Sequence, residues 1–180
     1  MIGLVALLTG SCCLVAIAHA QSCGKAGPYD AKNSIFGPGI GKYYLKKSTY
    51  TYEKPCLYVR VPEGNTLPAE YPFGYKEGGE WKKQTGQVRA DGDTIVDKDE
   101  VFGETKSKVV YSDYKNCDVT LFSGGKVEGE HVELWVHSDA KDGSNEVKCC
   151  EKRFKAELEK KSKKETDVKK VGDGCTYPTR

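Results

Sequence analysis

Two stretches of sequence decide how this chain folds: Cys117-Asp-Val-Thr-Leu-Phe122 and Val132-Glu-Leu-Trp-Val-His137. In each stretch, aliphatic residues alternate with residues that are acidic, polar or aromatic, which is the two-residue period of a β-strand. Eight residues separate Phe122 from His131, so the two strands are close enough in the chain to form a hairpin. We therefore predict an antiparallel pair with one aliphatic face and one face of carboxylates and aromatic rings.

The direction in which each face points is left open by alternation alone. An ordinary sheet turns its aliphatic face to the core and its charged face to water. A closed barrel allows the reverse, in which the aliphatic face packs outward under a helix while carboxylates and aromatic rings line a cavity. For Asp118 and Glu133 to share a face, the numbers of paired residues must sum to an odd value, as when Phe122 lies opposite His131.

Further short strands surround this pair. The candidates are runs of β-branched and aromatic residues at 43–45, 56–61, 94–96 and 108–111. Turn sequences rich in Gly, Asp, Asn and Pro separate them at 62–65, 78–79, 91–93 and 124–125. This pattern predicts a mainly β, antiparallel sandwich or barrel in a single domain.

Two helical segments flank the predicted strands. A short helical turn is expected at 29–36, before the first strand. A longer helix is expected from Val147 to about residue 164, because Val147, Cys150, Phe154 and Leu158 fall at helical spacing and form one apolar stripe. This stripe predicts that the C-terminal helix packs on the outside of the sheet.

The N-terminus has the pattern of an export signal. Residues 2–18 are almost wholly apolar, and Ala18-His19-Ala20 places small residues where a signal peptidase would cut. The apolar run is shorter than the roughly 20 residues of a membrane-spanning helix. We therefore expect a signal peptide at 1–20, a secreted mature domain at 21–180 and no association with a membrane.

Six cysteines remain in the expected mature chain: Cys23, Cys56, Cys117, Cys149, Cys150 and Cys175. An even number of cysteines in an exported chain predicts three disulfides, although spacing alone does not assign the pairs. Cys149 and Cys150 point about 100° apart on a helix, so we expect them to have different partners. Because no CxxC is present and the mature chain has two histidines, we expect no metal and no cofactor.

Charge and motif content exclude several classes of function. A formal net charge of +2 is far below that of a typical DNA-binding domain, so no nucleic-acid partner is expected. The lysine-rich segment at 160–164 suggests heparin or phosphate binding, but interleaved glutamates favour a solvated helix end. With no GxSxG, HExxH or P-loop pattern, the chain is not expected to be an enzyme. A disulfide-rich protease inhibitor fits the cysteines but not the long succession of strands.

Carboxylates and aromatic rings inside one cavity favour a particular ligand class. A buried carboxylate without a partner is costly, and an ammonium group can neutralise it through short charge-assisted hydrogen bonds. Trp135 and Phe122 could then stack on a flat ring. Histamine and serotonin each carry an ammonium on a two-carbon arm attached to an aromatic ring, and they match a site that contains Asp118 and Glu133.

The spacing of these residues also resembles a known signature. Cys117-Asp118-Val119, a gap of 13 residues, Glu133-Leu134-Trp135 and a second gap of 13 residues before Cys149 are similar to the biogenic-amine signature of tick salivary lipocalins. Supporting similarities occur at 42–45, at Tyr111-Ser-Asp113 and at the adjacent Cys149-Cys150. The likeness extends over the mature chain and is densest from residue 111 to 150.

This resemblance implies a fold, a site and a function. It implies an eight-stranded antiparallel lipocalin barrel with an N-terminal helical turn and an outer C-terminal helix, monomeric and secreted in saliva to sequester host histamine or serotonin. It implies disulfides Cys23–Cys149, Cys56–Cys175 and Cys117–Cys150. The residues expected to bind the ligand are Asp118, Glu133, Trp135, Phe122 and Tyr50.

Related lipocalins differ in the number and the class of ligands that they bind. Some related lipocalins bind two amines through acids near the first strand, but residues 37–41 of this chain contain no carboxylate, so one amine site is expected. Others hold leukotrienes or thromboxane, or bind complement proteins. A fatty-acid carboxylate would need an inward-facing cation, for which Arg60 and Arg89 are the candidates.

Overall fold

The computed structural model describes residues 23–24 and 27–178, so the predicted signal peptide lies outside the described residues. No helix in the described part of the chain is long and apolar enough to span a bilayer. The elements, in chain order, are α1 (Ala31–Phe36), β1 (Lys42–Ser48), β2 (Tyr58–Arg60), β3 (Ala69–Glu77), β4 (Glu80–Asp91), β5 (Thr94–Asp99), β6 (Gly103–Ser112), β7 (Cys117–Gly124), β8 (Val127–His137), α2 (Asn145–Lys160), the short 3-10 helix η1 (Glu165–Asp167) and β9 (Lys169–Lys170).

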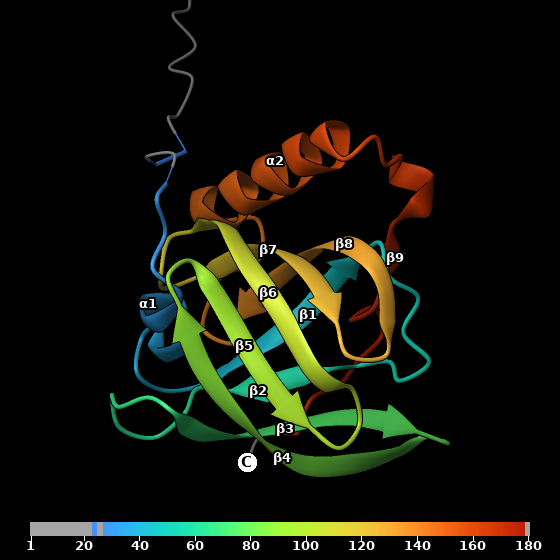
Figure 1. Cartoon of the computed structure of the whole chain (residues 1–180). Helices are drawn as coiled ribbons and strands as arrows, with labels where there is room; N and C mark the ends of the chain where they lie inside the picture. The colour runs from blue at the N-terminus through green and yellow to red at the C-terminus, as the bar shows by residue number, and fades with distance from the viewer. Residues whose placement is uncertain (1–22, 25–26, 179–180) are drawn as a thin grey trace, which may run out of the picture.

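The strands form a closed antiparallel barrel (Figure 1). Each strand from β2 to β7 pairs with the next one in the chain, and β1 pairs with both β8 and β2, which closes the ring. The two-residue strand β9 adds to β1 from the C-terminal segment. The eight-stranded lipocalin-type barrel that the resemblance implies is therefore confirmed.

The hairpin of β7 and β8 has the register that the sequence predicts. Phe122 lies opposite His131, and Asp118 lies opposite Trp135, so paired numbers sum to an odd value. Asp118 and Glu133 consequently share the inner face of the barrel. The aliphatic face points outward, where Val119 and Leu134 are fully buried beneath α2. The charged and aromatic face thus lines the interior.

Helix α2 packs along the outside of β7 and β8 (Figure 1). Its N-terminus is capped by Ser144, whose side chain accepts a hydrogen bond from the backbone N–H of Val147. Because of this cap, the helix begins two residues before the predicted start, and it ends at Lys160 rather than near residue 164. Phe154 and Leu158 lie buried against the barrel, and burial of each side chain is worth about 1.5–3 kcal/mol.

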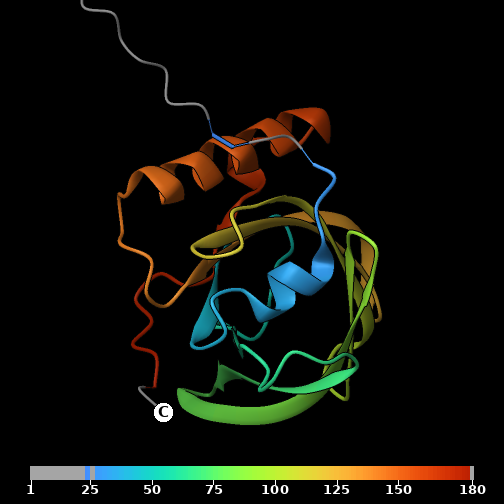
Figure 2. The ribbon, with the colours of Figure 1, turned by 90° about the vertical axis from the view of Figure 1, so that its left-hand side faces the viewer.

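Helix α1 lies across one open end of the barrel (Figure 2). Asp30 caps its N-terminus by accepting a 2.8 Å hydrogen bond from the backbone N–H of Lys32. Gly37 ends the helix with a φ of 41°, and a Cβ there would collide with the hydroxyl of Tyr43. Glycine is therefore required both for the turn and for the approach of Tyr43 to the inner side of α1.

The sequence pattern did not predict strands β3 and β4. Pro72 and Gly74 interrupt β3, and β4 is mostly polar, so their intrinsic β propensity is low. Pairing with neighbours in the closed ring stabilises them instead. Tyr71 lies directly opposite Gly86, where a Cβ would come within 2.7 Å of the tyrosine ring. The glycine leaves space for this ring at the barrel wall.

Three disulfides connect the barrel to its flanking segments. Cys23 bonds to Cys149 and joins the chain before α1 to α2. Cys117 bonds to Cys150 and joins β7 to α2. Cys56 bonds to Cys175 and joins the segment before β2 to the C-terminal segment. These are the pairs that the resemblance implies, and the adjacent cysteines of α2 have different partners.

Candidate functional site

The barrel interior contains two adjoining cavities. The first has a volume of about 90 Å³ and lies beneath α1, and we call it the α1-side cavity. The second has a volume of about 60 Å³ and is lined by Glu133, and we call it the Glu133 cavity. Five residues line both cavities: Val59, Tyr71, Asp97, Ser107 and Trp135. The cavities are therefore neighbouring parts of one interior.

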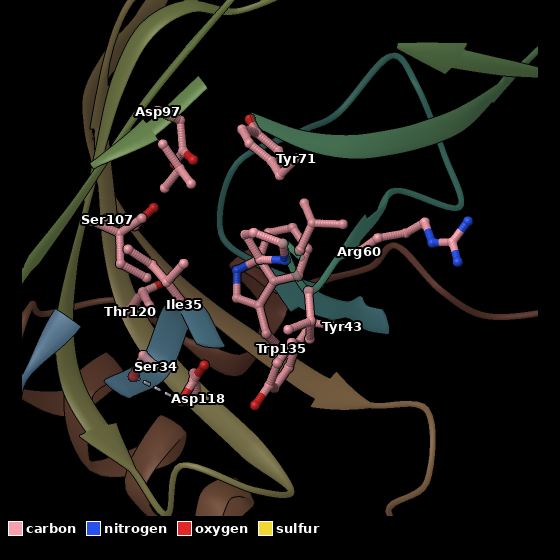
Figure 3. A pocket seen from close by; sticks show the side chains of 15 residues that line it. Ser34, Ile35, Tyr43, Arg60, Tyr71, Asp97, Ser107, Asp118, Thr120 and Trp135 are labelled. Carbon is pink, nitrogen blue, oxygen red and sulfur yellow. Dashed lines mark hydrogen bonds between the residues drawn. The ribbon is translucent and has the colours of Figure 1, made fainter. Parts of the chain in front are cut away.

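Asp118 is the acidic group at the α1 end of the interior. Its carboxylate accepts a 3.3 Å hydrogen bond from the hydroxyl of Ser34 in α1 (Figure 3) and another from Ser112. Burial raises the pKa of Asp118 to about 7, although the two serine hydroxyls partly oppose this effect. The carboxylate is thus held in place by neutral donors and can still change charge near neutral pH.

Two hydroxyl groups in this cavity have no hydrogen-bond partner. The side-chain oxygens of Tyr43 and Thr120 are buried and have no partner among the described residues, and both residues line the α1-side cavity together with Asp118. Buried hydroxyls are rarely left without a partner because desolvation is costly. Two unpaired hydroxyls beside a carboxylate indicate a polar ligand position.

Glu133 is the acidic group of the second cavity, and its side chain has no exposure to solvent. Its Oε1 accepts hydrogen bonds from the hydroxyls of Tyr52 at 2.6 Å and Ser48 at 3.2 Å. Its Oε2 accepts a 2.9 Å hydrogen bond from the indole N–H of Trp135. Burial raises the pKa of Glu133 to about 7 in spite of these three donors. The protein therefore already supplies hydrogen-bond donors to both oxygens of this carboxylate.

A third carboxylate, Asp97, lines both cavities from β5. Burial raises the pKa of Asp97 to about 7, and the negative charge of Asp99 adds to this effect. A hydrogen bond with Tyr71 acts in the opposite direction. Asp99 has a different role, because its Oδ1 accepts hydrogen bonds from the backbone N–H groups of Val101 and Phe102 at 2.7 and 2.8 Å. Asp97 therefore lines both cavities, whereas Asp99 lines only the Glu133 cavity and also holds a turn.

No ion pair joins a described Lys, Arg or His side chain to any carboxylate that lines the cavities, namely Asp97, Asp99, Asp118 and Glu133. Arg60 lines the mouth of the α1-side cavity, but its guanidinium group points away from Asp118 (Figure 3). Within residues 23–24 and 27–178, no group of His, Cys, Asp and Glu is arranged to hold a metal ion. The described interior therefore carries acidic groups without a protein counter-ion.

The structure separates the two carboxylates that the sequence analysis placed together. Asp118 lines only the α1-side cavity, and Glu133 lines only the Glu133 cavity. Trp135 lies opposite Asp118 in the hairpin and donates its indole N–H to Glu133, so its side chain connects the surroundings of the two carboxylates. The two acids belong to neighbouring inward-facing pairs of the hairpin, Asp118 with Trp135 and Glu133 with Thr120.

A model of the family described as tick histamine binding protein matches residues 25–171. The chain belongs to the tick histamine-binding protein family. A structure described as the serotonin complex of AM182 is similar to this family member, with 28% identity and a TM-score of 0.69 over 83% of this chain and 94% of that chain. The resemblance inferred from the spacing of Asp118 and Glu133 is thus confirmed.

More distant structures share the fold of this histamine-binding family member. Bovine odorant-binding protein, as a deswapped triple mutant, is 19% identical with a TM-score of 0.54, covering 77% of this chain and 98% of that one. The bovine lipocalin allergen Bos d 2 is 14% identical with a TM-score of 0.56, covering 81% and 99% of the two chains. At these identities the likeness shows the lipocalin fold alone.

The predicted aromatic residues occupy different layers of the site in this family member. Trp135 lines both cavities, and Phe122 lines the Glu133 cavity. Tyr50 lines neither cavity, and its ring lies against Tyr52 at 4.8 Å and Phe122 at 6.2 Å between ring centroids. Tyr52, two residues later, reaches Glu133 instead. Tyr50 therefore packs against Tyr52 and Phe122, which line the Glu133 cavity.

Several residues that line the two cavities were not predicted from the sequence. Asp97 alternates with Val96 in β5 and shares a face with Ile95, but the short pattern did not indicate which face was inward. Ser34 enters the cavity from α1, whose position over the barrel end depends on the tertiary fold. Local sequence did not distinguish Tyr43, which lines the α1-side cavity, from the adjacent Tyr44, which does not.

Proposed function

We propose that this protein is a secreted lipocalin that sequesters a host biogenic amine, histamine or serotonin, inside its barrel. The observation that carries the proposal is the set of interior carboxylates, Asp97, Asp118 and Glu133, that have no cationic partner among the described residues. A buried carboxylate is costly unless it is protonated or paired. An ammonium ligand supplies the opposite charge, so the acidic interior is complementary to a cation.

We place the ammonium group at Asp118 in the α1-side cavity. An ammonium has three N–H donors, and here it meets the Asp118 carboxylate and the unpaired hydroxyls of Tyr43 and Thr120. The Glu133 carboxylate already accepts three hydrogen bonds, so it offers fewer free lone pairs. The α1-side cavity is also the larger of the two, which favours it for a ring-bearing amine.

The aromatic ring of the amine would extend from Asp118 towards the shared wall of the two cavities. Trp135 and Tyr71 line this wall and offer flat surfaces for stacking. Ile35 of α1 covers the same space with an apolar side chain. The serotonin bound to the related AM182 supports an aromatic amine as the ligand class.

An eicosanoid ligand fits the described interior less well. Its carboxylate would meet Asp97, Asp118 and Glu133 and would need a cation there. Arg89 lies outside the barrel, where it pairs with Glu104 at 3.7 Å and is half exposed. Arg60 directs its charge out of the cavity mouth (Figure 3). No feature of the described residues favours a complement protein as partner.

Secretion and the effect on the host form the second half of the proposal. Three disulfides fit a protein that folds in an oxidising compartment, and the predicted signal peptide at 1–20 supplies the export route. An amine held in the barrel is removed from its receptors. We propose that the protein thereby suppresses inflammation and haemostasis at the bite, acting by binding and not by catalysis.

Isothermal titration of the purified, oxidised protein with histamine, serotonin and leukotriene C4 tests the proposal. We expect saturable heat with at least one amine and none with the leukotriene. Two charge-assisted hydrogen bonds worth roughly 1.5–3 kcal/mol each, with ring burial in addition, are consistent with sub-micromolar binding. Heat from leukotriene C4 together with silence from both amines would overturn the amine proposal and leave the lipocalin fold intact.

A further inference from the structure

The acidic groups of the interior are spread along the barrel and not gathered at one point. Asp118 lies at the α1 end, Glu133 lies in the second cavity, and Asp97 lines both cavities. Figure 3 shows Asp97 and Asp118 on opposite sides of the α1-side cavity. A compact monoamine in that cavity neutralises the carboxylate that it touches and leaves a buried acid elsewhere.

The walls between these acids are largely apolar and aromatic. Val59, Tyr71 and Trp135 line both cavities, so they form the boundary that a ligand reaching from one to the other would follow. Such walls suit a methylene chain, which gains from burial and requires no hydrogen bonds. The interior thus alternates cation-binding positions with hydrocarbon-binding surface.

Unpaired hydroxyls mark one end of this series as a ligand position. Tyr43 and Thr120 are both buried, lack a partner and line the cavity of Asp118. The other end, at Glu133, is already oriented by Tyr52, Ser48 and Trp135. Two preorganised acidic ends, joined by an apolar boundary, are complementary to a ligand with a cation at each end.

We propose that the barrel also binds a linear aliphatic diamine or polyamine. Its two terminal ammonium groups lie at Asp118 and Glu133, and its methylene chain runs along the residues that line both cavities. Asp97 lies beside this path and attracts a secondary ammonium when the chain contains one. Asp99 lines the Glu133 cavity as well and adds negative charge at that end of the path, with its Oδ1 held by two backbone N–H groups. The inference rests on the proposed amine-binding function and extends its ligand class.

The physical basis is the connection of two binding groups in one molecule. Once the first ammonium is bound, the second is confined near its carboxylate, so its binding costs less translational entropy. A second charge-assisted hydrogen bond contributes roughly 1.5–3 kcal/mol, or at least about tenfold in affinity. The gain depends on chain length, because too short a chain cannot reach the second carboxylate.

A titration series tests this inference. The oxidised full-length mature protein would be titrated with α,ω-diamines from 1,3-diaminopropane to 1,8-diaminooctane, with spermidine, and with the monoamine of equal carbon number for each diamine. We expect one diamine per chain, an optimum at one chain length, and affinity at least about tenfold above that of the matched monoamine. Equal affinity of diamine and monoamine, or two diamines per chain, would overturn the inference.

Isosteric variants locate the two ends. Asp118→Asn and Glu133→Gln should each abolish the advantage of the best diamine over its monoamine, and the double variant should weaken the diamine further, because it removes the carboxylate that each single variant keeps. The matched control is Glu100→Gln, which removes an exposed carboxylate and should leave both affinities unchanged. A thermal melt of each variant reports whether it folds, and a variant that keeps the diamine advantage would place that end elsewhere.

Histamine and serotonin, titrated in the same experiment, separate this inference from the proposed function. Binding of an aromatic amine without any diamine advantage would reject the inference and retain the function. A diamine advantage without aromatic amine binding would reject the function and retain a cation-binding interior. Silence from every amine would reject both.

Discussion

The phenolic hydroxyl of Tyr52 donates a 2.6 Å hydrogen bond to Oε1 of Glu133, deep in the second cavity of the barrel. Burial raises the pKa of Glu133, and the hydrogen bond from Tyr52 is the largest of the effects that lower it. The burial that favours a protonated, neutral Glu133 is therefore opposed by a neighbour that favours its charge. An acid adjusted in this way can carry a negative charge near neutral pH while it remains enclosed.

Substitution Tyr52→Phe removes this donor and keeps the ring, so the pKa of Glu133 should rise further above 7. Carbon-13 detected titration of the Glu133 carboxyl measures this directly in the protein without ligand. Tyr50→Phe is the matched control, because Tyr50 lies one layer behind and does not reach Glu133. An unchanged titration curve in Tyr52→Phe would contradict the role given to this hydrogen bond.

Asp118→Asn should weaken histamine or serotonin binding by roughly 10- to 100-fold, because it removes the charge from the proposed ammonium position. Glu133→Gln should weaken the same amine by less than about tenfold, since its carboxylate belongs to the neighbouring cavity. Calorimetry at pH 8, where both carboxylates are ionised in the unmodified protein, compares the two. If the order of the effects were reversed, the ammonium would lie at Glu133.

The stability of the protein without ligand should fall as pH rises from about 4 to about 7. Asp97, Asp118 and Glu133 have pKa values raised to about 7 in the folded state. Unfolded carboxyls release their protons near pH 4, so in this window the folded state holds more protons, and stability decreases with pH. Each pKa unit corresponds to about 1.4 kcal/mol. Melting temperatures at pH 5.5 and pH 8 should therefore differ by several degrees.

An amine should reverse this dependence, because it binds the ionised carboxylates. At pH 8 a saturating amine should raise the melting temperature substantially, and below pH 6 its effect should be small. Asp118→Asn isolates one contributing group and should flatten part of the pH dependence of the ligand-free protein. An identical pH dependence in this variant would show that Asp118 is ionised throughout the range.

Phe154→Ala should destabilise the fold by about 3–5 kcal/mol, because it leaves a cavity between α2 and the barrel. Phe154 is buried on the outer side of β7 and β8, away from the acidic interior. Amine affinity in the folded fraction should therefore change little. Urea denaturation measures the stability, and calorimetry below the unfolding transition measures the affinity. A large loss of affinity would indicate that α2 positions the inner face of the hairpin.

Local patterns were informative where strand faces differ strongly. The alternation in β7 and β8 predicted which residues share a face, and the odd-sum register of Phe122 and His131 followed from that requirement alone. The apolar stripe of α2 predicted its outer position in the same way. Strands β3 and β4 carry weak local patterns, so only their pairing in the closed ring reveals them.

The sequence by itself determined the β class, the even set of six cysteines after residue 20 and the acidic and aromatic face of the β7–β8 hairpin, since these depend on residue type and two-residue periodicity. Only the tertiary structure decided that Asp118 and Glu133 line different cavities, that Asp97 from β5 lines both, and that Tyr52 donates a hydrogen bond to Glu133. The reason is geometric. Closure of the barrel and the placement of α1 bring together residues far apart in the chain, and periodicity within one strand contains no information about the strand across the cavity.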